Sequence, residues 1–120
     1  EENHVTSSRA RFDYARREID RNFGLALAGP TNRWVREAIV QSYWLQVAMR
    51  SLRTPILLMQ AEKEVVVVPK TQTVLCAKTK MCRLLKIDGA KHEVLMENDS
   101  IRDGVIASSL SFFSNYGAAR

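Results

Sequence analysis

The stretch PILLMQ, residues 55–60, decides the fold, because it is a continuous apolar run with helical patterns before it and charged residues after it. An uninterrupted run of this length is typical of a parallel strand covered on both faces. A second run, MCRLLKI at residues 81–87, is interrupted only by two basic residues. Between the two, Pro69 favours the first turn of a short helix through about Thr79. This order predicts two parallel strands joined by a right-handed crossover, so both strands end at the same edge of the sheet.

Two amphipathic helical patterns precede the first strand. Residues 9–23 place apolar side chains three or four positions apart, as in one stripe of a helix, and Ser7 or Ser8 can serve as the N-cap. Glycine and proline interrupt the pattern before Thr31, which is a natural cap for a second helix running to about Arg50. The apolar stripe of this second helix is wide, which predicts that the helix packs against the sheet.

The last helix is expected at about residues 101–116, with Asp99 or Ser100 as its cap. The resulting class is α/β, but two parallel strands leave two open edges and too little sheet for the helices to cover. We therefore expect part of the sheet to lie in another stretch of chain. The open edges predict either a homodimer or an association with the missing N-terminal part.

Composition and charge narrow the class of protein. Hydrophobic residues make up 46% of the 120 and charged residues 26%, as in a globular domain. The net charge of +5 is spread along the chain without a nucleic-acid reading motif, so we expect no nucleic-acid partner and at most a peripheral contact with an anionic membrane. No apolar run approaches the roughly 20 residues of a transmembrane helix. The first residues lack an initiator Met and a signal-peptide pattern, which predicts a cut or processed end.

The two cysteines, Cys76 and Cys82, are too few and too irregularly spaced for a disulfide framework or a zinc site. We expect both to be buried thiols, which favours a reducing compartment. The predicted location is therefore cytoplasmic, with a place at the periphery of the inner membrane left open. The sequence indicates no metal ion and no cofactor.

Charged residues follow both strands at the edge where ligands and catalytic groups collect in parallel sheets. These are QAEKE at residues 60–64 and GAKHE at residues 89–93. A carboxylate in the first loop can reach His92 in the second, and a carboxylate that orients an imidazole is the supporting half of a Ser-His-acid triad. By themselves, the residues leave a structural histidine and a solvated Glu64 open as alternatives. No G-x-S-x-G nucleophile motif occurs in the chain.

Three segments in order resemble bacterial lysophospholipases and monoacylglycerol lipases of the α/β-hydrolase superfamily. They resemble, in turn, the end of the cap with the helix after it, the strand and loop of the triad acid, and the loop of the histidine. The segments are residues 6–14 with 25–35, residues 55–67, and residues 89–102.

The resemblance implies that the chain is the C-terminal portion of an α/β-hydrolase, with the end of the cap at residues 1–29 and the core at residues 30–120. It assigns His92 as general base and Glu64 as triad acid, with Glu62 as the nearer competitor for the acid and Glu93 as the other. His4, near the expected cut end, is given no role. The implied activity is hydrolysis of a lipid ester, a lysophospholipid or monoacylglycerol, by a serine that lies outside this chain.

The resemblance has one consequence for the 120 residues alone, and two other hypotheses compete with it. The 120 residues alone are expected to be inactive, because the nucleophile and the oxyanion donors would lie elsewhere. A hydrolase-derived binding or interaction module without catalysis is the second hypothesis. A flavodoxin-like or nucleotide-binding domain is the third, and it is disfavoured because no glycine-rich phosphate loop follows either strand.

Overall fold

The computed structural model describes residues 3–117, which form four α-helices, two short 3₁₀ turns and two strands. The order alternates around the two strands as the sequence predicts. The elements are α1 (Arg9–Arg21), η1 (Phe23–Leu25), α2 (Asn32–Ala48), β1 (Ile56–Ala61), α3 (Pro69–Cys76), β2 (Cys82–Ile87), η2 (Val94–Met96) and α4 (Asp99–Gly117).

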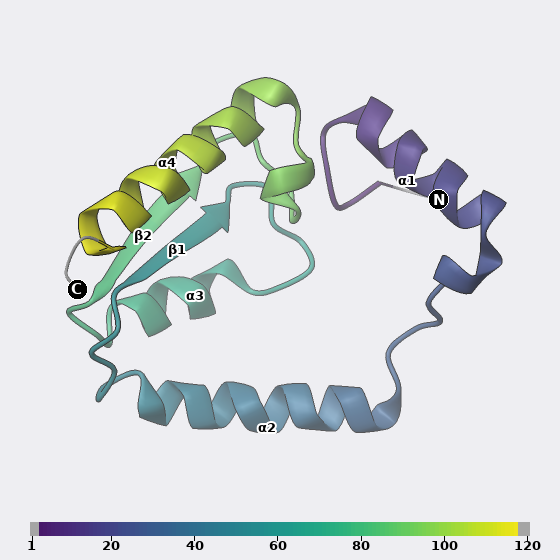
Figure 1. Ribbon diagram of the computed structural model, residues 1–120. Helices are drawn as coiled ribbons and strands as arrows, with labels where there is room; N and C mark the ends of the chain where they lie inside the picture. The colour runs from purple at the N-terminus through teal and green to yellow at the C-terminus, as the bar shows by residue number, and fades with distance from the viewer. Residues whose placement is uncertain (1–2, 118–120) are drawn as a thin grey trace.

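The two strands form a parallel sheet, so the predicted α/β class and strand direction are confirmed. Their register runs from Ile56 opposite Cys82 to Ala61 opposite Ile87. Both arrows point the same way in Figure 1, with α3 as the crossover between them. Each strand begins one residue later than predicted. Both loops that follow the strands therefore start at the same edge.

The ends of α1 are set by side chains that bond to free backbone groups. Ser8 is the N-cap, and its hydroxyl accepts the N–H of Arg11 at 3.4 Å. The helix ends at Arg21, two residues before the predicted end, because Asn22 leaves the helical conformation. The Asn22 side chain accepts the N–H of Gly24 at 3.1 Å and so begins η1, which the sequence did not predict.

The starts of α2 and α4 are also set by side chains that accept a free backbone N–H. Thr31 caps α2 as predicted, with its hydroxyl accepting the N–H of Trp34 at 3.1 Å. The predicted caps of α4, Asp99 and Ser100, are wrong. Asn98 Oδ1 accepts the N–H of Ile101 at 3.2 Å, which lets the helix begin at the residue directly after Asn98.

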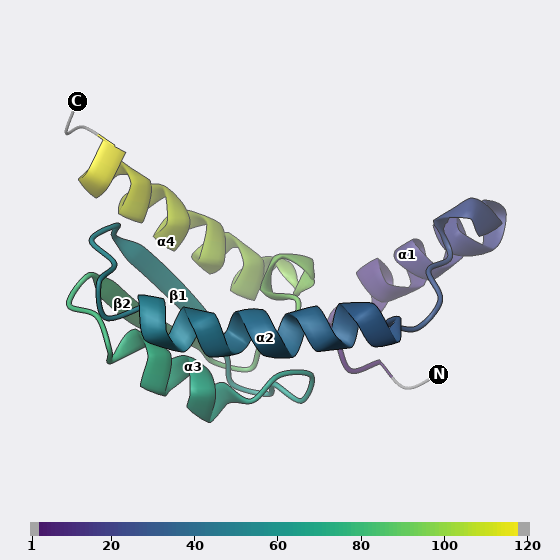
Figure 2. The ribbon, with the colours of Figure 1, turned by 90° about the horizontal axis from the view of Figure 1, so that it is seen from below.

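Helices α3 and α4 lie on opposite sides of the sheet (Figure 1). Helix α2 does not pack against these two strands, since none of its helical residues is buried. Its packing against the part of the sheet expected in another stretch of chain stays a prediction. Two strands spaced about 4.8 Å apart make a face only about as wide as one helix. Helix α3 already contacts both strands on that side, and α2 lies farther out, as Figures 1 and 2 show.

The core is correspondingly small. The buried apolar residues are Met49, Ala61, Cys76, Ala90 and Val105. A helix lies on each face of the strands, but the burial is less complete than predicted, since the apolar residues of β1 other than Ala61 are only half-buried. The radius of gyration is 16.7 Å, where about 14 Å is expected for a compact domain of this length. Within residues 3–117, no third strand covers either outer edge of the sheet.

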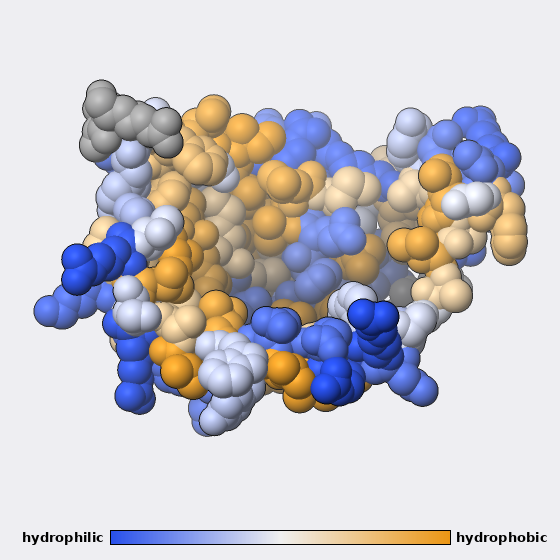
Figure 3. Space-filling view, turned by 60° about the horizontal axis from the view of Figure 1, so that its bottom comes forward, coloured by the Kyte–Doolittle hydropathy of each residue, from blue (hydrophilic) through white to orange (hydrophobic). Residues whose placement is uncertain are grey.

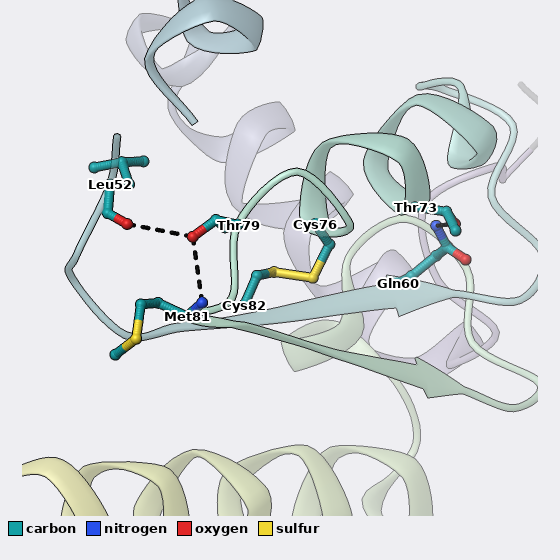
Figure 4. Close-up of a disulfide and its surroundings, with 7 residues drawn as sticks. All are labelled: Leu52, Gln60, Thr73, Cys76, Thr79, Met81 and Cys82. Atoms are coloured by element: carbon teal, nitrogen blue, oxygen red, sulfur yellow. Dashed lines mark hydrogen bonds between the residues drawn. A yellow bond between two sulfur atoms is a disulfide. The ribbon is translucent and has the colours of Figure 1, made fainter. Parts of the chain in front are cut away.

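Cys76 and Cys82 form a disulfide, so the prediction of two buried thiols is wrong. Helix α3 ends at Cys76, three residues before its predicted end, and β2 begins at Cys82. The turn between them brings the two Cα atoms to 5.2 Å, which suits a disulfide. Figure 4 shows Thr79 in this turn, where it accepts the N–H of Met81 at 3.2 Å and donates to the Leu52 carbonyl at 3.3 Å. The expectation of a reducing compartment relied on free thiols, so the disulfide leaves it without support.

Replacing both cysteines with serine is expected to lower the free energy of unfolding by about 2 kcal/mol, as the entropy of closing so short a loop predicts. Thermal melts of the full-length protein with and without a reductant measure this. The reductant should lower the Tm of the wild type and leave the double variant unchanged. Equal Tm values for the oxidised wild type and the double variant would contradict a stabilising disulfide.

Candidate active site

Glu64 and His92 meet beyond the carboxyl ends of the two strands. Glu64 lies three residues after β1, and His92 lies five residues after β2. The distance between Glu64 Oε2 and His92 Nδ1 is 2.7 Å, and the two side chains are 4% and 33% exposed. The prediction that this carboxylate lies within hydrogen-bond reach of the ring is confirmed.

The carboxylate of Glu64 is held at both oxygens. Its Oε1 accepts the N–H groups of Val66 at 2.7 Å and Val67 at 3.2 Å, while Oε2 faces His92. Burial alone would raise the pKa of Glu64, but the hydrogen bond with His92 and the two backbone N–H groups outweigh it and hold the pKa below its usual range. Glu64 is therefore ionised at neutral pH.

An ionised carboxylate is only an acceptor, so His92 Nδ1 carries the hydrogen and donates it. In the neutral ring, Nε2 is then the unprotonated nitrogen, and it accepts no hydrogen bond from residues 3–117. A neutral imidazole with Nδ1 anchored and Nε2 free is the arrangement of a general base.

The two loops are tied to each other directly after the strands. Lys63 N–H donates to the Ala90 carbonyl at 2.8 Å, and Glu62 Oε2 accepts the N–H of Gly89 at 2.7 Å. Gly89 has a φ of 72°, a conformation that favours glycine, and this turn directs the chain toward His92. Hydrogen bonding between the strands thus continues into the loops and holds Glu64 and His92 in register.

The two other glutamates considered for the acid, Glu62 and Glu93, do not bond to the His92 ring in the described chain. The Glu62 carboxylate is occupied by Gly89, and Glu93 is exposed, with its backbone N–H donating to the Val5 carbonyl at 2.8 Å. His4 is also exposed, on the N-terminal segment. Of the side chains that the structure describes, Glu64 is the carboxylate that bonds to the His92 ring.

Comparison with known proteins shows the family. Residues 2–99 match the model of the family described as serine aminopeptidase, S33, a range that includes Glu64 and His92. The chain belongs to this family. It is a family of α/β-hydrolases, so the resemblance noted in the sequence is confirmed.

Two curated relatives of this S33 chain carry a lysophospholipase name. A probable lysophospholipase L2 of Haemophilus influenzae is 35% identical over 114 residues, which are 95% of this chain and 36% of that protein. Lysophospholipase L2 of Escherichia coli K12 is 31% identical over 123 residues, covering 97% of this chain and 36% of the relative. The chain thus spans about a third of the length of the curated relatives it matches.

Two residues that support the Glu64–His92 pair did not stand out in the sequence of this chain. The first is Gln60, the buried residue near the end of β1. Its Nε2 donates to the Pro69 carbonyl at 2.7 Å and lies 3.1 Å from Gln72 Oε1 and 3.3 Å from Thr73 Oγ1. Figure 4 shows Gln60 reaching from the strand to α3. These bonds link the end of β1 to α3 and so close the loop that carries Glu64. In the sequence, the feature that could have indicated this role is a single glutamine at the end of an apolar run.

The second missed residue is Glu97, which is fully buried. It lies five residues after His92 and bonds to Ser7, which is 90 residues away in the chain. The sequence contained Glu97 within the segment that resembles a histidine loop, but nothing in its spacing indicates so distant a contact.

An apolar groove lies between α2 and the loop that follows Glu64. Figure 3 shows apolar side chains around a hollow in this face of the S33 chain. Trp34 and Ile39 in the groove are 63% and 66% exposed, so they are available for contact. The residues lining it are Trp34, Val35, Ala38, Ile39, Ser42, Tyr43, Gln46, Val66 and Val68.

Residues 3–117 contain no cluster of three or more side chains placed to hold a metal ion. In the same part of the chain, no helix combines the length and apolar character needed to cross a bilayer. What the described residues do bring together is the carboxylate of Glu64 and the imidazole of His92.

Proposed function

We propose that this chain supplies the base and the acid of a Ser-His-acid triad in a carboxylic-ester hydrolase. The observation that carries the proposal is the 2.7 Å contact between Glu64 and His92 at the carboxyl edge of a parallel sheet. The proposed serine lies in a part of the protein outside these 120 residues, which contain no G-x-S-x-G motif.

In the proposed mechanism, His92 Nε2 takes the proton of the serine hydroxyl as its oxygen attacks the ester carbonyl. Glu64 stabilises the imidazolium that forms, through the bond to Nδ1. The imidazolium then donates its proton to the leaving alcohol, and the acyl group stays on the serine. In the deacylation step, Nε2 takes a proton from a water molecule as the water oxygen attacks the acyl carbon. The bond between the acyl carbon and the serine oxygen then breaks, which releases the carboxylic acid, and the imidazolium returns the proton to the serine oxygen.

We also propose that the chain is the C-terminal portion of the hydrolase, with the end of the cap in residues 1–29 and core in residues 30–120. The chain spans about a third of each curated relative, which is consistent with its being one portion of such a protein. Helix α1 also lies beyond the carboxyl ends of the strands in both ribbon views, where a cap would sit (Figures 1 and 2). The open sheet edges would pair with the rest of the protein, or with a second copy when this part is alone.

The proposed substrate is a lipid ester, either a lysophospholipid or a monoacylglycerol. The lysophospholipase names of the two relatives support this class. The apolar groove beside Val66 and Val68 would accept part of an acyl chain, since it adjoins the loop of the proposed triad acid. The net charge of +5 suits a peripheral contact with an anionic membrane, where such substrates reside.

An assay with three ester or amide substrates tests the proposal. The full-length protein should hydrolyse a lysophospholipid or a monoacylglycerol, and an aminoacyl p-nitroanilide should be a poor substrate. The isolated 120-residue chain should hydrolyse none of them, because it lacks the nucleophile and the oxyanion donors. Activity of the isolated chain would contradict an outside serine. A full-length protein inactive on all three would favour the alternative, a hydrolase-derived binding or interaction module.

A further inference from the structure

A second buried carboxylate, Glu97, belongs to the loop that carries His92. Its side chain is fully buried, whereas most acidic side chains of folded proteins are exposed. The loop begins after β2 and ends at Glu97 itself, just before α4. Glu97 is therefore placed to join the two ends of the same loop.

The first contact of Glu97 is with the backbone next to the histidine. Glu97 Oε1 accepts the N–H of Lys91 at 2.8 Å. On the other side of His92, the N–H of Glu93 donates to the Val5 carbonyl at 2.8 Å. Both backbone neighbours of His92 are thus anchored, which limits how far its ring can move relative to Glu64.

The other contacts of Glu97 are with the N-terminal segment. Its Oε1 also accepts the N–H of Ser7 at 2.9 Å, and its Oε2 accepts the hydroxyl of Ser7. Asn98 adds its own N–H to Oε2 at 3.4 Å. The carboxylate thus joins the segment before α1 to the histidine loop. Hydrogen bonds to an ionised acceptor are about twice as strong as those between neutral groups.

Charge and neighbouring contacts strengthen this junction. Burial raises the pKa of Glu97, but the donors from Ser7, Lys91 and Asn98 outweigh it and hold the pKa below its usual range. The carboxylate is therefore ionised while buried. The backbone of the same loop is held by Thr6, whose hydroxyl donates to the Met96 carbonyl at 2.7 Å.

We propose that Glu97 is a positioning residue that fixes the His92 loop against residues 5–8, so that the ring keeps its hydrogen bond to Glu64. The proposal rests on the catalytic role of His92 proposed above. The Glu97 carboxylate makes no hydrogen bond to the ring in the described chain, and it acts through the Lys91 N–H and the Ser7 contacts. The end of the proposed cap would thereby form part of the support for the base.

The test is Glu97→Gln in the full-length protein, which keeps the size of the side chain but removes its charge. Glu93→Gln is the matched control, because it makes the same change in the same loop on an exposed side chain. One readout is the downfield proton NMR signal of His92 Nδ1–H, assigned by its loss in His92→Ala. The other is kcat and KM for the lipid ester.

For Glu97→Gln we expect a broadened or lost Nδ1–H signal and a kcat lowered on the order of 10- to 100-fold, as misplacement of a catalytic group by about 1 Å can cause. KM should change little, because the substrate contacts remain. Glu93→Gln should keep the signal and stay within about twofold in kcat, as usual for a surface change. Ser7→Ala, which removes one donor, should shift both readouts in the same direction by less.

An Nδ1–H signal and a kcat for Glu97→Gln equal to those of Glu93→Gln would overturn the proposal. If Glu97→Gln does not fold, Ser7→Ala decides by the same two readouts. Failure of the proposed function would look different, since His92→Ala would then keep full activity. The NMR signal would still report in that case whether Glu97 holds the ring in place.

Discussion

Substituting His92 with alanine in the full-length protein is expected to lower kcat/KM for a lysophospholipid or monoacylglycerol by about 10⁴-fold or more, as losses within a triad generally do. In the proposed mechanism, the imidazole of His92 takes the proton from the serine as it attacks, and alanine cannot do this. Thermal stability should change little, because the ring is one-third exposed and has one hydrogen-bond partner in the described chain. Steady-state ester hydrolysis and a thermal melt of the same sample measure both effects.

His4→Ala is the control for this experiment, because it makes the same chemical change at an exposed position of the N-terminal segment. Its activity should equal that of the wild type. If His92→Ala hydrolysed the ester at the rate of His4→Ala, then His92 would not be the base and the proposed function would fail.

The second large effect is expected for Glu64→Gln, which should lower kcat by about 10⁴-fold, the size seen when a triad acid becomes an amide. The Val66 and Val67 N–H groups will keep the amide oxygen at the Oε1 position. The amide NH₂ will then face His92 Nδ1 and donate to it. The ring must therefore carry its hydrogen on Nε2, where it cannot accept the proton of the serine.

Nitrogen-15 NMR of the histidine ring distinguishes the two tautomers directly, so the cause is measured along with the rate. Glu62→Gln is the matched control, because Glu62 bonds to Gly89 rather than to the ring. This control should retain the wild-type tautomer and lose far less activity. A larger loss for Glu62→Gln than for Glu64→Gln would reverse the assignment of the acid.

The sequence by itself was sufficient to predict that the loops carrying Glu64 and His92 lie at one edge of the sheet. Two apolar runs with one short helix between them specify parallel strands, and parallel strands place the loops after them at one edge. That rule depends on local periodicity and chain connectivity, which are both visible in the sequence. The class and the shared edge were therefore predictable, although the residues alone left the choice between Glu62 and Glu64 open.

Contacts between distant residues were decided only by the tertiary structure. Periodicity shows that α2 has an apolar face, but the width of the sheet determines whether that face is covered, and here Trp34 stays exposed. The pairing of Cys76 with Cys82 depends on how tightly the turn between them closes. The burial of Glu97 depends on Ser7, 90 residues away, because a carboxylate can be buried only where folded backbone supplies enough N–H donors.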